Sequence, residues 1–163
     1  MKFMKKLMLI LLVGVLGAAT AYAQPMGKRT FVAHLSGAEE VPAVETLARG
    51  QSVLQLSRDG ERLEYRLMVA NIENVTQAHI HLGFAGTNGP VVAWLYPPAP
   101  PLMLIPGRFD GVLAAGALTA ADLRGPLMGM ELSALMDAIR NGEAYVNVHT
   151  LQYPPGEIRG QIR

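Results

Sequence analysis

Two histidines placed two residues apart are the part of the chain best suited to chemistry. His79 and His81 stand in the run AHIHL (78–82) and are two of the four histidines in the sequence. Successive side chains of a β-strand point to opposite faces, so the two imidazoles share a face, with their Cα atoms roughly 6.5–7 Å apart. At that spacing two ring nitrogens can bind one metal ion or line one polar site.

Two later stretches, 144–150 and 157–162, repeat this alternation of polar and apolar residues. The polar faces carry Tyr145, Asn147 and His149 in the first stretch, and Glu157, Arg159 and Gln161 in the second. If the apolar faces of the three strands pack into one core, the polar faces also come together. We therefore expect one polar cluster, consisting of His79, His81 and His149 as candidate metal ligands and Asn147, Glu157 and Arg159 as the surrounding network.

Two interpretations of this cluster stay open. In the first, the three histidines bind a metal ion; the chain has no cysteine, so imidazole nitrogens point to copper or zinc. Such ligands need an acceptor for the second ring nitrogen, which Glu157 or a backbone carbonyl can supply. In the second, the same side chains form a structural hydrogen-bonded network, with Glu157 and Arg159 as an ion pair.

Other catalytic patterns are missing from the sequence. It contains no Ser/His/Asp arrangement, no cysteine nucleophile and no paired-carboxylate motif. Glu39 and Glu40 are adjacent, so they would face apart in a strand, and we expect a solvated turn there. An enzymatic role is therefore not favoured, and a metal-dependent activity stays open only through the histidines.

A binding module is the competing functional class. The proline-rich segment 97–106 and the glycine-rich loop 83–89 would present surface to an extracellular protein or glycan partner. Within the first segment, the apolar residues 102–105 are expected to fold as a flap over the core. Nucleic acid is not an expected partner, since the chain has no basic cluster and few aromatic residues.

The first 23 residues have the features of a secretory signal peptide. Three lysines precede an apolar run, and Ala21-Tyr22-Ala23 matches a signal peptidase site, with cleavage expected before Gln24. The alternative is an uncleaved membrane anchor, for which the apolar run is short. Residues 24–163 are expected to form a single domain with a net charge of about −2, secreted or periplasmic and free of the membrane after cleavage.

The pattern of apolar residues predicts an all-β protein. Strands are expected at 30–36, 50–57, 61–70, 75–82, 90–96, 109–115, 143–150 and 157–163, with a bend at 71–74, a capped turn at 119–122 and a helix at 133–140 that Ser133 caps. Because strands outnumber helices and do not alternate with them, we expect an antiparallel Greek-key β-sandwich of about eight strands with one or two short helical segments.

Several of these segments, taken together, resemble the CHRD (chordin-like) domain family. The matching motifs are LSGAEEVP (35–42), AHIH (78–81), GTNGP (86–90), LTAADL (118–123), NGEAYVNVHT (141–150) and PGEIRGQI (155–162). They keep the family's order and span nearly the whole chain after residue 23. The resemblance implies a single β-rich extracellular domain without a firmly established general activity.

A looser similarity concerns the copper site of Cu/Zn superoxide dismutase, which also combines a His-x-His strand with a later strand histidine. His79, His81 and His149 would be the matching ligands, which implies a copper-dependent redox protein as an alternative function. Two features depart from that family: the chain lacks the cysteines of its disulfide, and His34 is the only histidine left for a zinc site.

Overall fold

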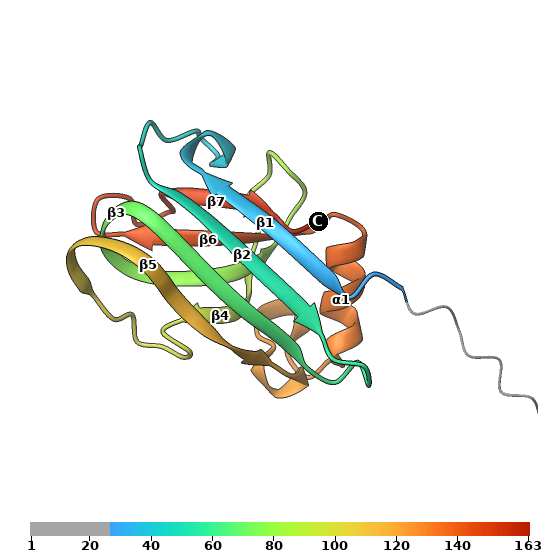
Figure 1. Cartoon of the computed structure of the whole chain (residues 1–163). Coiled ribbons are helices and arrows are strands. Elements are labelled where there is room, and N and C mark those ends of the chain that lie inside the picture. The colour runs from blue at the N-terminus through green and yellow to red at the C-terminus, as the bar shows by residue number, and fades with distance from the viewer. Residues whose placement is uncertain (1–26) are drawn as a thin grey trace, which may run out of the picture.

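One long, bent strand organises the computed structural model, which describes residues 27–163 (Figure 1). Strand β3 (Leu63–Leu82) bends near Asn71 and Asn74, whose φ angles are +55° and +53°. Asparagine tolerates this left-handed backbone conformation better than most residues. Before the bend β3 pairs with β2 (Arg49–Leu56), and after it with β4 (Val91–Tyr96) and β6 (Ala144–Thr150), while β5 (Ile105–Leu118) follows it from Leu63 to Val75.

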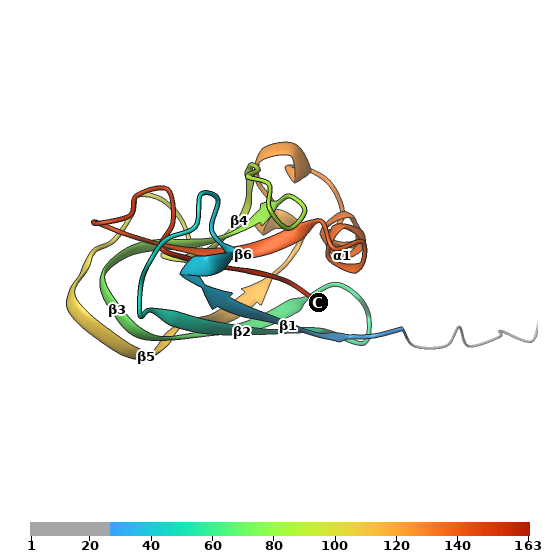
Figure 2. The same ribbon diagram turned by 90° about the horizontal axis from the view of Figure 1, so that it is seen from above.

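Two further strands close the sheet on itself. Strand β1 (Thr30–Ser36) pairs with β2 on one side and with β7 (Ile158–Gln161) on the other, and β7 pairs with β6. Since β3 pairs with both β2 and β6, five strands form a closed barrel in the order β2-β1-β7-β6-β3. Figure 2 shows β3 curving from the layer of β1 and β2 to the layer of β4 and β6.

The antiparallel all-β prediction is confirmed, since every pairing is antiparallel. The more specific prediction of a Greek-key sandwich does not describe the observed sheet. The strands form one closed sheet, and β4 and β5 pair with β3 outside the barrel. Residues 27–163 contain seven strands and not the expected eight, because the predicted bend at 71–74 lies within one continuous strand and does not separate two.

The helix lies at the end of the barrel where β1 begins (Figure 1). Helix α1 (Leu132–Arg140) buries Leu135, Met136 and Ile139. Its N-cap is Glu131, which lies two residues before the expected cap at Ser133. The predicted capped turn is confirmed: Thr119 and Asp122 form a reciprocal capping box around the 3₁₀ turn η2 (Ala120–Asp122), while η1 (Gly37–Glu39) and η3 (Gly125–Leu127) are similar single turns.

The expected flap over the core is wrong for most of its length. Leu102, Met103 and Leu104 are exposed, and only Ile105, which pairs with Val75, packs against the core. The prolines before this segment provide no amide hydrogens for sheet pairing, which leaves the chain on the surface until β5 begins.

Barrel closure predicts a strict requirement for glycine in β7. A methyl group on Gly160 would overlap the backbone carbonyl of His34 on β1, which cannot move without breaking the seam between the two strands. We expect Gly160→Ala to lower the free energy of unfolding by about 2 kcal/mol or more, measured by urea denaturation. Gly27→Ala is the control, because its Cβ would meet nothing within 4 Å; equal stability of the two variants would contradict the packing described.

Candidate metal centre

The structure brings the three predicted histidines together on neighbouring strands. In the antiparallel register of β3 and β6, His79 lies opposite Asn147, and His149 lies opposite Gln77. The imidazole centroids are 5.5 Å apart for His79 and His81, 5.0 Å for His79 and His149, and 5.9 Å for His81 and His149. One nitrogen from each ring lies within 4.8 Å of the others.

Hydrogen bonds define which ring nitrogens are available as ligands. The Nδ1 atoms of His81 and His149 are each 2.9 Å from a backbone carbonyl oxygen, of Gly89 and Pro154 respectively. A carbonyl only accepts, so both Nδ1 atoms carry the hydrogen and both Nε2 atoms carry a lone pair. The sequence analysis offered Glu157 or a backbone carbonyl as the acceptor that orients the rings. Backbone carbonyls have this role for His81 and His149, and Glu157 does not.

The lone pairs of these rings converge without enough donors to satisfy them. His79 Nδ1 lies 3.1 Å from His149 Nε2 and can donate to it. The Nε2 atoms of His79 and His81 are buried and have no hydrogen-bond partner among the described residues. Two nitrogens bound to one tetrahedral metal ion lie about 3.3 Å apart, so a metal ion can replace the hydrogen between His79 Nδ1 and His149 Nε2, with the His79 hydrogen moved to its Nε2.

Burial keeps the cluster uncharged. The exposed fractions of His79, His81 and His149 are 3%, 8% and 5%. Burial, together with the neighbouring His149 and His81, lowers the pKa of His79 to about 3. Burial also lowers the pKa of His149 to about 4 and moves the pKa of His81 below its usual value. Neutral imidazoles are the protonation state that binds metal, so the site is competent at neutral pH.

Aromatic rings enclose the histidines. Trp94 on β4 packs edge-on against His79 with 4.3 Å between ring centroids. Tyr145 stacks on His81 at 4.9 Å with an interplanar angle of 12°. The guanidinium carbon of Arg159 lies 3.4 Å from the Tyr145 centroid, so a cation, a phenol ring and an imidazole form one continuous stack.

Arg159 ties the glycine-rich loop to this stack. It is 1% exposed and donates to the Asn88 side chain and to the Phe84 carbonyl, at 3.2 and 3.0 Å. The expected ion pair with Glu157 does not form between these two described residues. Glu157 instead accepts hydrogen bonds from Thr46 and Thr150, so its charge is satisfied by hydroxyls.

Glu40 is the site residue that the sequence analysis missed. It is 7% exposed, contrary to the solvated turn expected there, whereas Glu39 is exposed. Burial raises the pKa of Glu40 to about 7, against the opposing effects of Arg159 and of the Asn147 amide. A methyl group on Gly156 would overlap the Asn147 amide, which shows how tightly the loop after β6 packs over this carboxyl group. The only feature of the sequence that pointed to Glu40 is its position within the CHRD-like motif LSGAEEVP (35–42).

Geometry defines this protein as a small antiparallel β-barrel with a buried three-histidine cluster. The family model described as CHRD domain matches residues 31–162, nearly the whole chain, and the chain belongs to the CHRD domain family. Neither the curated proteins nor the solved structures gave a significant match. Within residues 27–163, no helix is both long and apolar enough to cross a membrane.

The buried Glu40 predicts a pH-dependent difference between two variants. The unfolded chain loses this proton near pH 4.5 and the folded protein near pH 7, so wild-type stability from this group falls as the pH rises between those values. Glu40→Gln stays neutral, and its stability relative to wild type should increase by roughly 1–3 kcal/mol between about pH 5 and about pH 7.5. Glu39→Gln, at an exposed site, should give a curve parallel to wild type in chemical denaturation; a parallel curve for Glu40→Gln would contradict the assignment.

Proposed function

We propose that this CHRD-family chain is an exported binding or accessory protein that holds one copper or zinc ion through His79, His81 and His149. In this proposal residues 1–23, which lie outside the described residues, are a signal peptide. Residues 24–163 are then a single secreted or periplasmic domain. The observation that carries the metal assignment is the convergence of one buried nitrogen from each of three rings, with His81 Nε2 left without a hydrogen-bond partner among residues 27–163.

The unpartnered nitrogens favour a metal site over a purely structural network. A structural polar network in a protein interior normally satisfies its members, because each buried unpaired group costs about 1–3 kcal/mol. Here His81 Nε2 carries a lone pair without a donor among residues 27–163, while the outer nitrogens of His81 and His149 are firmly oriented. Binding a cation would use the inner lone pairs and leave the orienting hydrogen bonds of His81 and His149 intact.

The donor set restricts the identity of the ion. It consists of three neutral imidazoles, with no thiolate or carboxylate among the grouped ligands. Imidazole suits zinc and copper, whereas magnesium and calcium prefer oxygen ligands. At a site of fixed ligands, copper(II) binds more tightly than zinc, so we expect the affinity for copper(II) to be the higher of the two.

Calorimetric titration of the mature chain, from Gln24 onward, with Cu(II) and Zn(II) tests the proposal. We expect one ion per chain and a loss of at least about tenfold in affinity for His81→Ala. Trp94 is the only tryptophan in the sequence and contacts His79, so copper(II) binding should also quench its fluorescence. A bound metal should also raise the melting temperature, and more so for the ion with the higher affinity.

His34→Ala is the matched control, because His34 is exposed and does not belong to the cluster. Its titration curve should superimpose on that of wild type. If neither ion binds, while His81→Ala merely lowers stability, the cluster is a structural network. The search for a partner then turns to extracellular proteins or glycans and to the exposed segment around Met103.

A copper-dependent redox protein with a superoxide-dismutase-like site is the second candidate. The observation in its favour is that three protein ligands leave one position of a four-coordinate ion open. We expect the copper-loaded protein to be reduced by ascorbate and reoxidised by oxygen with its metal retained, followed by the Cu(II) electron paramagnetic resonance signal. Copper that is released on reduction, or that ascorbate cannot reduce, would rule out this role and leave the binding function in place.

A further inference from the structure

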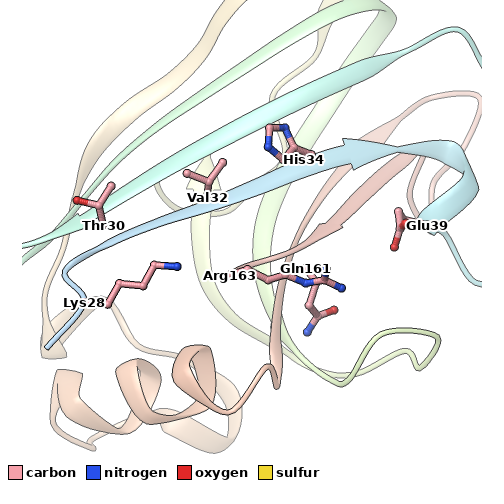
Figure 3. Close-up of a pocket in the computed structure, with 7 residues that line it drawn as sticks. All are labelled: Lys28, Thr30, Val32, His34, Glu39, Gln161 and Arg163. Carbon is pink, nitrogen blue, oxygen red and sulfur yellow. The ribbon is translucent and has the colours of Figure 1, made fainter.

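Two adjoining cavities lie beside β1 and the end of the chain, and none of the histidine-cluster residues lines them. The first, of about 410 Å³, is lined mainly by residues with polar side chains, and we call it the polar cavity (Figure 3). Its lining residues are Lys28, Thr30, Val32, His34, Glu39, Gln161 and Arg163. Side chains of β1 alternate between two faces. Thr30, Val32 and His34 face this cavity, whereas Phe31 and Ala33 point into the core.

The second cavity, of about 470 Å³, has an apolar floor. Phe31, Ile139 and Ile162, all buried core residues, line it from β1, from helix α1 and from the segment after β7. Both volumes fall in the range of small-molecule sites, about 300–1,000 Å³. Lys28 and Arg163 line both cavities, so two positively charged side chains lie where the polar and the apolar cavity meet.

The charges of the second cavity are all positive, whereas Glu39 is the one acidic residue that lines the first. Lys28, Arg140 and Arg163 line the second cavity, and no acidic residue does. Arg140 pairs with Asp137 at 3.2 Å, whereas Lys28 and Arg163 have no ion-pair partner among residues 27–163. Arg163 is held in place because its backbone exchanges two hydrogen bonds with Val32. Unpaired cations above an apolar floor complement a molecule with an acidic head and an apolar body.

We propose that this double cavity binds a small, freely diffusing anionic amphiphile. Its apolar chain or ring lies over Phe31, Ile139 and Ile162, and its acidic head lies between Lys28 and Arg163. The polar cavity then receives the hydrated side of the head group. This site is independent of the metal proposed above.

Calorimetric titration of the mature protein with decanoate below its micelle concentration tests this assignment. Decanoate should bind at one molecule per chain. Acetate, which has the head alone, and decanol, which has the chain alone, should each bind at least about tenfold more weakly, since both halves of the ligand are recognised. His81→Ala should bind decanoate as wild type does, which keeps this result separate from the metal site.

Variants of the two shared cations locate the binding. Lys28→Gln and Arg163→Gln should each weaken decanoate binding about tenfold and leave the melting temperature unchanged, because both side chains are exposed. Arg66→Gln, at an exposed position of β3 outside both cavities, is the matched control and should bind as wild type. The proposal is overturned if decanoate binding is not saturable, if the double Lys28→Gln/Arg163→Gln variant binds it unchanged, or if only vesicles of phosphatidylcholine with phosphatidylglycerol bind.

Discussion

The pairing of β3 with β6 is the constraint on which the histidine cluster depends. Each strand alternates polar and apolar side chains, so the register between them decides which polar groups meet. The observed register sets His79 against Asn147 and His81 against Tyr145. A slip of one residue would turn Val146 and Val148 out of the core and separate the histidines, at a cost in buried apolar area that the barrel could not recover.

The rest of the sheet maintains that register. Strand β3 must leave the layer of β1 and β2 and reach β6, and the two asparagines at positive φ produce the turn without ending the strand. β7 then joins β6 to β1, and Gly160 allows the close approach of that seam. Closing the barrel removes free edges between these five strands, so the register is set from both sides.

Local patterns predicted the strands, while contacts between distant segments escaped the sequence. Alternation of period two located β1 with its observed bounds and put the three histidines on polar faces. It could not show that β3 pairs with both β2 and β6, because ring closure depends on the whole sheet. Glu40 was missed for a related reason: its burial comes from Arg159, Asn147 and the loop at Gly156, which lie more than 100 residues further along the chain. The apolar character of residues 102–105 predicts a flap over the core, but the extended proline-rich segment before them keeps Leu102 to Leu104 on the surface.

Electrostatics around the cluster decide which occupant it can accept. Arg159 is buried, and its charge is directed at the Tyr145 ring and two loop oxygens. Burial is the main reason why the pKa values of His79 and His149 lie far below normal, and among the three histidines the charge of Arg159 contributes only to lowering the pKa of His81. A metal cation meets the same burial but gains three coordinate bonds that a proton does not. In the proposed metal centre, three buried neutral imidazoles therefore suit a divalent ion better than protons.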